Sequence, residues 1–228
     1  SIFLAKMSHE IRTPMHAIIA LLDSLQDDKR LHPELLETVN TILESTEVLV
    51  GMISNLLDIN KAEAGQMSLT INPFIPREVL EKCVLLFEQR ARLGNVSLSI
   101  VTSSLSHPEE SILALPEEDR SAAMLLPVED SAKLLVQSDA PRIRQVIFNL
   151  LSNAIKYASA AVTLAWKLFL VENQQFRGIL HVEVHDDGPG IAAPYRAHIF
   201  KSFFQGDSAH RGTGLGLAIC SQLTKLFR

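Results

Sequence analysis

The feature that most constrains this 228-residue chain is a run of apolar residues at heptad spacing between positions 35 and 57. One row alternates steps of four and three residues and consists of Leu35, Val39, Ile42, Thr46, Leu49, Ile53 and Leu56. A second row advances by seven residues and consists of Leu36, Leu43, Val50 and Leu57. Two adjacent rows form a stripe too wide for a two-stranded coiled coil, so the pattern predicts a helix of a larger bundle.

The preceding segment supplies a second helix for this bundle. Its apolar residues share one helical face and are Met7, Ile11, Met15, Ile18, Leu22 and Leu25. A turn is expected at residues 27–33, with Pro33 suited to the first turn of the second helix. Because two helices cannot bury both stripes well, we expect a helical hairpin that forms a four-helix bundle with a second copy.

One histidine of the first helix lies on the side opposite its apolar face. His9 is about 160° around the helix from the nearest apolar positions, Thr13 follows one turn later, and Pro14 should bend the helix just after His9. The adjacent Glu10 could hold the proton of one ring nitrogen and leave the other as a nucleophile. The apolar pattern alone favours a plain dimerisation hairpin, and an exposed histidine is usually only solvated. The carboxylate, the hydroxyl and the kink beside His9 shift this weighting towards a functional residue. His16 is too distant for a zinc-binding HExxH site.

Composition excludes several classes of protein. Apolar residues make up 47% and charged residues 21% of the chain, which suffices for a sizeable core and excludes wholesale disorder. The net charge of -5 argues against a nucleic-acid binder. Cys83 and Cys220 are too few for a metal cluster or a disulfide framework, so we expect a reducing compartment. The apolar runs are short, so we expect no membrane contact from this segment, which begins like a cut from a longer protein.

The rest of the chain alternates strands with helices. We expect strands at Met67–Ile71, Val96–Val101, Val162–Val171 and Ile179–Val184, and helices at Pro76–Leu93, Ala140–Tyr157 and Gly214–Phe227. Asp139 is the expected N-cap of the middle helix, and Gly94 is the expected C-cap of the first. Residues 103–137 mix Ser, Pro and acidic residues, which predicts a solvated insertion of low order. The second part of the chain is therefore predicted to be an α/β domain.

Three local patterns in this part suit a nucleotide. Glycines at positions 212, 214 and 216 precede or open the last helix, where backbone amides can approach phosphates. Asp186 to Gly190 form a tight turn at a strand end, where a buried carboxylate could accept a hydrogen bond from a base amine. One helix face carries Asn149 and Asn153, with Lys156 and Tyr157 close by, which suits a metal-bridged triphosphate and a stacked base.

Each of these patterns also has a plain structural interpretation. They could be a flexible loop, a structural turn and a polar helix face. The chain has no Gly-Lys-Ser/Thr phosphate-binding loop, and its glycine-rich segment does not follow a strand as a dinucleotide fingerprint requires. Taken singly, the patterns therefore leave the function open.

Taken together with the first helix, they resemble sensor histidine kinases. Residues 3–15 resemble the phosphoacceptor H box, especially that of the hybrid branch of the family. Further matching segments follow in the family's order: the end of the second bundle helix at 56–65, the N box at 149–157, the G1 box at 186–191, the F box at 199–204 and the G2 box at 212–216. The implied fold class is α+β. A dimerisation and histidine-phosphotransfer hairpin at 1–68 and a linker at 69–74 precede a GHKL-type ATP-binding domain at 75–228, an α/β sandwich with a mixed sheet.

The resemblance assigns roles to the hairpin and to the N box. It implies that His9 receives the γ-phosphoryl group of ATP, that Glu10 orients or deprotonates its ring, and that Thr13 helps to position water when the phosphoryl group is removed. The N box would hold the metal and the phosphates: Asn153, with Asn149 nearby, would bind Mg²⁺, Lys156 would touch a phosphate and Tyr157 would line the nucleotide site.

The remaining boxes would bind the base and border the lid. Asp186 would read the adenine amine, and Gly188 and Gly190 would let that turn approach the base. The residues implied at the lid over the phosphates are Gly212, Gly214 and Gly216 at its border and Phe200 and Phe203 as anchors of its base.

The implied activity is ATP-dependent autophosphorylation of His9, followed by transfer to an aspartate of a response-regulator receiver domain, with phosphatase activity. The implied partners are a second copy and the receiver domain, and the implied location is a cytoplasmic segment of a membrane-bound sensor protein. The alternative is a catalytically weak module that regulates another histidine kinase by dimerisation. Departures from the family pattern are His16 in place of Asn, a short lid at 205–211, the insertion at 103–137 and the lack of a final hairpin after Arg228.

Overall fold

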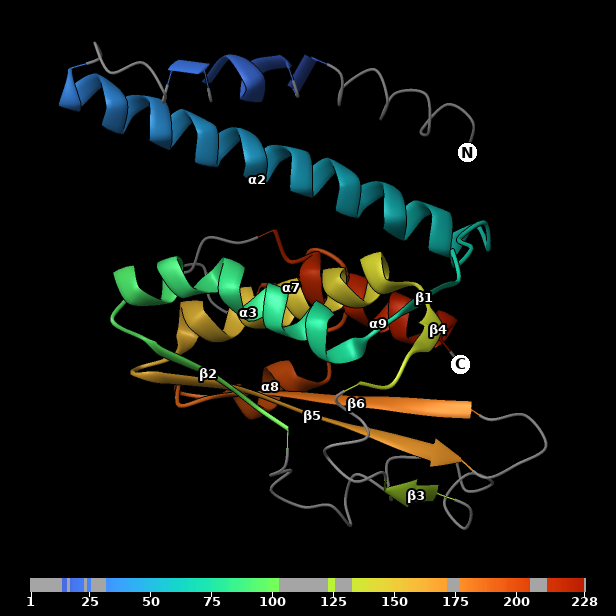
Figure 1. The fold of residues 1–228 in the computed structure, drawn as a ribbon. Coiled ribbons are helices and arrows are strands. Elements are labelled where there is room, and N and C mark those ends of the chain that lie inside the picture. Colours follow the sequence, from blue (N-terminus) through green and yellow to red (C-terminus); the bar gives the residue numbers. More distant parts are fainter. Residues whose placement is uncertain are drawn as a thin grey trace. The chain divides into compact units, whose positions relative to one another are not determined.

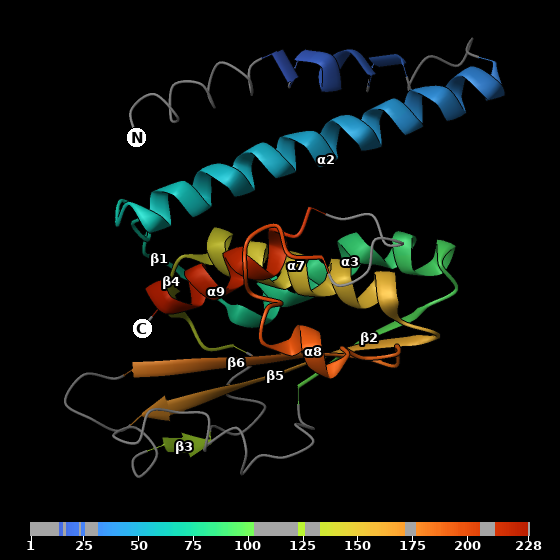
Figure 2. The same cartoon turned by 180° about the vertical axis from the view of Figure 1, so that it is seen from behind.

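The computed structural model describes residues 14–15, 17–22, 24–25, 32–102, 123–125, 133–171, 177–205 and 213–227. Figures 1 and 2 show the chain from opposite sides. It divides into two compact units, one comprising Ser1–Ser68 with Ala197–Arg228 and the other comprising Leu69–Arg196. Each unit is described by itself below.

The first unit is built on a long helix, α2 (Pro33–Glu63). Pro33 lies in its first turn, as predicted, because proline has no N–H to lose there. The described residues between 14 and 25 are also helical, as expected for the first helix of a hairpin. The predicted turn before α2 falls mostly outside the described residues. A further helix of this unit, α9 (Gly216–Leu226), packs against α2.

Burial divides the heptad row of α2 into two lines. Val39 and Thr46 are buried, and the Thr46 hydroxyl donates a 2.8 Å hydrogen bond to the carbonyl of Ile42 one turn earlier. The alternate members of the row are 40–56% exposed and recur every seven residues: Leu35, Ile42, Leu49 and Leu56. A line of large apolar side chains left in water along one helix is typical of an interaction surface.

The second unit contains a mixed four-stranded sheet. At its centre, β5 (Ala161–Val171) pairs along its length with antiparallel β6 (Arg177–Asp186). The other edge of β5 pairs first with parallel β2 (Ser97–Val101) and then with antiparallel β3 (Ala123–Leu125). A separate two-stranded sheet joins β1 (Asn72–Phe74) to antiparallel β4 (Val136–Ser138).

Two helices cover one face of this sheet, α3 (Pro76–Leu93) and α7 (Ala140–Tyr157) (Figures 1 and 2). Alternate residues of β5 point into the core beneath them, because side chains of a strand alternate between its faces: Val162, Leu164, Trp166 and Leu168. Between the helices, the rings of Phe87 and Phe148 meet edge to face with centroids 5.3 Å apart. The arrangement confirms the predicted α/β sandwich with a mixed sheet.

The caps of the two helices follow the prediction closely. The Asp139 carboxylate caps α7 by accepting a hydrogen bond of 3.0 Å from the backbone N–H of Arg142. Helix α3 ends at Gly94, although the left-handed residue there is the following one, Asn95, with φ 56°. Asparagine tolerates this conformation better than most residues with a side chain.

Three local predictions were wrong. Residues 67–71 form no strand: β1 starts at Asn72, where pairing with β4 begins, and Thr70 instead donates its N–H to Asp139 at 2.8 Å. The region expected to be a loop of low order, 103–137, contains β3 and the start of β4, and its residues 103–122 and 126–132 lie outside the described ones. Helix α9 begins two residues later than expected, because Gly214 adopts φ 67°, outside the helical region.

Candidate nucleotide-binding site

Several of the predicted site residues lie outside the described part of the chain. These are His9, Glu10, Thr13 and Gly212, together with His16 and most of the predicted lid. The other predicted residues are described, and they lie on α7, on the turn after β6 and on the segment that leads into α9.

The polar face of α7 is opposite its core face. Ile147, Leu151, Ala154 and Ile155 are buried residues of this helix, so helical periodicity places Asn149 and Asn153 on the other side, one turn apart. The side-chain nitrogen of Asn149 is buried without a hydrogen-bond partner among the described residues. Because such a group is costly to leave unpaired, an additional polar partner at this position would stabilise it.

At the end of α7, a cation lies beside an aromatic ring. The ammonium of Lys156 donates a hydrogen bond of 3.2 Å to the hydroxyl of Tyr157 and lies 4.8 Å from the centroid of its ring. Both side chains are exposed, which leaves them accessible to a ligand. A positive charge and an aromatic face close together suit a phosphate and a base.

The turn after β6 carries the predicted adenine-reading residue. Asp186 is the last residue of the strand, and its Oδ1 accepts a 3.0 Å hydrogen bond from the N–H of Gly188. The expectation that this carboxylate is buried is wrong, because Asp186 is exposed where the chain leaves the sheet. Gly190 has φ 72°, a left-handed conformation that favours glycine and lets the turn reverse direction.

This turn lies directly against the end of α7. A Cβ atom added to Gly188 would collide with the carbonyl oxygen of Tyr157, so only glycine allows this approach. The carboxylate of Asp187 accepts hydrogen bonds from the N–H groups of Ser159, at 2.8 Å, and Ala160, at 3.0 Å. Sequence reasoning did not single out Asp187, because nothing in the order of residues shows that its side chain reaches back to the loop after α7.

In the other unit, a backbone hydrogen bond joins the segments on either side of residues 206–212. The N–H of Phe203 donates to the carbonyl of Gly214 at 2.9 Å, and both residues have left-handed φ values of 62° and 67°. The rings of Phe200 and Phe203 are exposed, and the anchoring of the lid base by these residues stays a prediction. The ring of the neighbouring Phe204 packs near the ring of His198, with the two centroids 5.8 Å apart.

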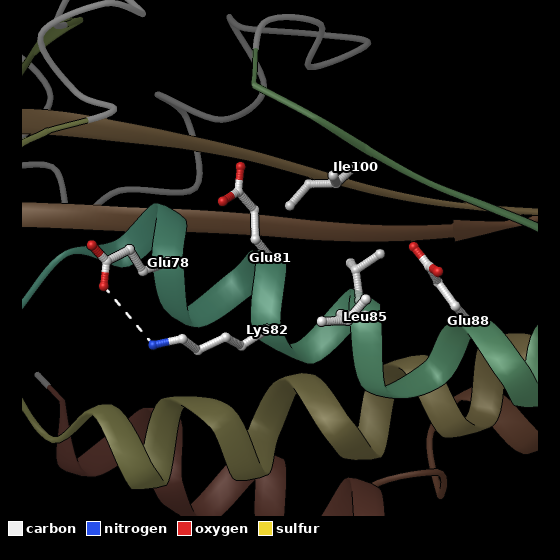
Figure 3. A pocket seen from close by; sticks show the side chains of 7 residues that line it. Glu78, Glu81, Lys82, Leu85, Glu88 and Ile100 are labelled. Atoms are coloured by element: carbon white, nitrogen blue, oxygen red, sulfur yellow. Dashed lines mark ion pairs between the residues drawn. The ribbon is translucent and has the colours of Figure 1, made fainter.

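A hollow on the surface of α3 is a separate feature. The residues that line it are Glu78, Glu81, Lys82, Val84, Leu85, Glu88 and Ile100 (Figure 3). Within this lining, the ammonium of Lys82 lies 4.0 Å from the carboxylate of Glu78. It shares no residue with the predicted nucleotide site. We therefore do not assign it to nucleotide binding.

Two further observations concern the described residues. Among them, no helix combines the length and the apolar character needed to cross a bilayer. Nor do their His, Cys, Asp and Glu side chains form a group of three or more that could hold a metal ion.

Comparison with known proteins identifies both parts of the chain. Residues 1–65 match the His Kinase A (phospho-acceptor) domain, and residues 138–228 match the family of histidine kinase-, DNA gyrase B- and HSP90-like ATPases. The chain is 31% identical to hybrid signal transduction histidine kinase F of Dictyostelium discoideum, over 98% of this chain and 18% of that protein. It is 31% identical to the sensor protein TorS and 32% identical to the sensor histidine kinase RcsC, both of Escherichia coli, in each case over 99% of this chain and 21% of the relative.

Solved structures agree with these matches. The crystal structure of full-length ShkA in complex with AMPPNP is similar over 98% of this chain and 40% of ShkA, with a TM-score of 0.63 and 26% identity. The Acinetobacter baumannii histidine kinase AdeS shares the fold, with a TM-score of 0.54 and 23% identity over 96% of this chain and 86% of AdeS. The chain spans about a fifth of the length of the curated relatives it matches. With a phospho-acceptor domain followed by an ATPase domain, it belongs to the sensor histidine kinases of two-component systems, which are enzymes.

Proposed function

We propose that this chain is the catalytic core of an ATP-dependent protein-histidine kinase that phosphorylates its own His9. The observation that carries the proposal is the close approach of the turn after β6 to the end of α7, where Gly188 lies against the carbonyl of Tyr157. The predicted adenine-reading and phosphate-binding segments, which are distant in the sequence, are neighbours in space. The similarity to ShkA, solved in complex with AMPPNP, also supports an adenine nucleotide as the ligand.

Adenine recognition is assigned to Asp186. Its Oδ1 is engaged by the N–H of Gly188, so Oδ2 is the atom that we expect to accept a hydrogen bond from the exocyclic amine of adenine. Guanine carries an oxygen at the corresponding position, which would place one acceptor against another and disfavour its binding. The neighbouring ring of Tyr157 is 40% exposed and is available to line the site.

The phosphates and Mg²⁺ are assigned to the polar face of α7. The buried Nδ2 of Asn149, which has no hydrogen-bond partner among the described residues, could donate to a phosphate oxygen. The amide oxygens of Asn149 and Asn153 are of a type that Mg²⁺ accepts as ligands. When bound, Mg²⁺ would neutralise part of the triphosphate charge. Lys156, whose ammonium donates to the Tyr157 hydroxyl, adds a positive charge from the protein itself, which suits a phosphate.

Phosphoryl transfer to His9 requires little covalent chemistry from the protein. A ring nitrogen of His9 forms a bond to the γ-phosphorus while the bond from that phosphorus to the β–γ bridging oxygen breaks, and ADP leaves. Glu10 would hold or accept the proton of the ring. Thr13 would help to position water when the phosphoryl group is removed by hydrolysis, which releases inorganic phosphate. The phosphoryl group would then pass to an aspartate of a receiver domain.

The exposed apolar line of α2 supports a homodimer. Leu35, Ile42, Leu49 and Leu56 would be buried by the same line of a second copy, which gives a two-fold interface. We propose that the dimer presents phospho-His9 to the receiver domain. We also propose that the chain is a cytoplasmic segment of a membrane-bound sensor protein.

The test is incorporation of radioactive phosphate from ATP labelled at the γ position. The wild type should become labelled, and the label should pass to an added receiver domain. His9→Gln should abolish labelling, whereas His16→Gln, which removes another histidine of the same predicted helix, should retain it. Labelling of His9→Gln would refute the acceptor assignment. No labelling of the wild type would instead favour the alternative, a module that regulates another kinase by dimerisation.

A further inference from the structure

The inference concerns Asp187, which stands between the proposed adenine-reading residue and Gly188. Its Oδ1 accepts hydrogen bonds from the N–H groups of Ser159, at 2.8 Å, and Ala160, at 3.0 Å, and its Oδ2 accepts from Ala160 at 3.0 Å. Its own N–H donates to the carbonyl of Ala161 at 3.3 Å. The side chain and the backbone of one residue therefore hold the loop that joins α7 to β5.

These bonds extend the hairpin beyond its ladder. The pairing of β5 with β6 ends at Val162 and Asp186, and one further backbone bond, from the N–H of Asp187 to the carbonyl of Ala161, continues it. Beyond that bond, the carboxylate of Asp187 forms a bridge to the N–H groups of Ser159 and Ala160. Asp186, the last residue of the ladder, directly precedes this bridge, and Gly188, which directly follows it, lies against the carbonyl of Tyr157.

The charge of Asp187 suits this role. Hydrogen bonds from the backbone N–H groups of Ala160 and Ala161 lower the pKa of its carboxyl, so it is ionised at neutral pH. An ionised carboxylate only accepts hydrogen bonds, so both of its oxygens can serve the loop, Oδ1 accepting from Ser159 and Ala160 and Oδ2 from Ala160. An asparagine side chain has the same shape but one acceptor oxygen, and its NH₂ group would face an N–H donor.

We propose that Asp187 is a positioning residue for base recognition. By fixing the turn after β6 to the end of α7, it sets the position of the Asp186 carboxylate and so the preference for a nucleotide with an exocyclic amine. The proposal rests on the proposed function of Asp186 as the adenine reader.

The test compares the affinities of the chain for ATP and for ITP, which has an oxygen in place of the amine. Titration calorimetry should show that the wild type prefers ATP. Asp187→Asn should weaken ATP binding about tenfold, with little effect on ITP, because only ATP uses the positioned carboxylate. In autophosphorylation, the KM for ATP should rise by a similar factor while kcat changes less than threefold.

The matched control is Asp139→Asn. Asp139 also accepts two backbone N–H groups, from Thr70 and Arg142, but it lies at the opposite end of α7. This variant should lower the melting temperature and leave the ratio of ATP to ITP affinity unchanged.

Two results would overturn the inference. If Asp187→Asn weakens ATP and ITP binding equally, Asp187 only stabilises the turn, and the proposed function stands. If the wild type itself does not distinguish ATP from ITP, the role of Asp186 fails, and the role of Asp187 fails with it.

Discussion

Phe203 and Gly214 are joined by a backbone hydrogen bond of 2.9 Å that closes the segment between them. The two residues are so close that a Cβ atom added to Gly214 would lie 2.7 Å from the carbonyl carbon of Phe203. Both also have left-handed φ values, which are uncommon for a residue with a side chain such as phenylalanine. The base of the predicted lid is therefore fixed by a backbone contact that requires glycine on one side.

Gly214→Ala should disrupt this contact. Alanine at φ 67° costs about 1 kcal/mol, and the collision with Phe203 adds to it, so we expect lower thermal stability and weaker ATP binding. The matched control is Gly51→Ala, because Gly51 lies within α2 with no atom near its added Cβ. That variant should raise stability by up to about 1 kcal/mol. Unchanged melting and ATP affinity in Gly214→Ala would show that the contact is not needed.

The dimer should depend on the exposed apolar line of α2. Leu49→Glu places a charge in the proposed interface twice, once from each copy. Since a buried leucine contributes about 2 kcal/mol, we expect dimerisation to weaken at least about a hundredfold. Sedimentation equilibrium measures this change. Leu93→Glu, at an 80% exposed position at the end of α3, should leave the dimer intact. A Leu49→Glu protein as dimeric as the wild type would place the interface elsewhere.

Much of the fold followed from local sequence signals. Asp139 was recognisable as a cap because it precedes a run with a proline in its first turn and an apolar face of helical period. The strand expected at Met67–Ile71 was misplaced because alternation alone does not fix a register. The partners that fix it, β4 and the Asp139 carboxylate, lie about seventy residues along the chain.

The candidate site could be predicted only in part from local sequence signals. The spacing of Asn149 and Asn153 places them on one helix face, so that part follows from periodicity. The exposure of Asp186 and the bridge made by Asp187 depend on where β6 ends relative to the loop after α7, and no local pattern encodes that position.

Glu183, on the sheet face opposite the core beneath α3 and α7, makes a contribution to stability that depends on pH in the acid range. Its carboxylate accepts hydrogen bonds from the Nε2 atoms of His181, at 2.9 Å, and His185, at 2.8 Å. Partial burial alone would raise the pKa of Glu183, but these bonds and the nearby histidine charges outweigh it and lower the pKa. A lowered pKa stabilises the fold above the ordinary carboxyl range, and this contribution is lost as pH falls through the folded pKa.

Glu183→Gln should therefore make the free energy of unfolding less dependent on pH in the acid range. Urea unfolding at pH 7 should show a loss of about 1 kcal/mol, and the difference from wild type should shrink as the pH is lowered below the ordinary carboxyl range. The control is Glu81→Gln, which removes an exposed ion pair with Arg77 and should change stability by less than about 0.5 kcal/mol. A constant difference at all pH values would contradict the assignment.

Cys83 should behave as a buried, unreactive thiol. Burial raises the pKa of its thiol to about 11, with only partial opposition from the charge of Arg144. Because the folded pKa is raised, its contribution to stability is complete below pH 9 and is lost as pH rises towards 11. Iodoacetamide at pH 8.5 should label Cys83 only after unfolding in guanidinium, as followed by mass spectrometry. Rapid labelling of the native protein would contradict its burial.

The most direct test of the central claim is the location of the phosphoryl group after incubation with ATP and Mg²⁺. Peptide mass spectrometry at neutral to alkaline pH should place it on His9, and brief acid treatment should remove it, because a phosphorus–nitrogen bond on histidine is acid-labile. A phosphoryl group on Ser8, Thr13 or His16, or one that survives acid, would contradict the account.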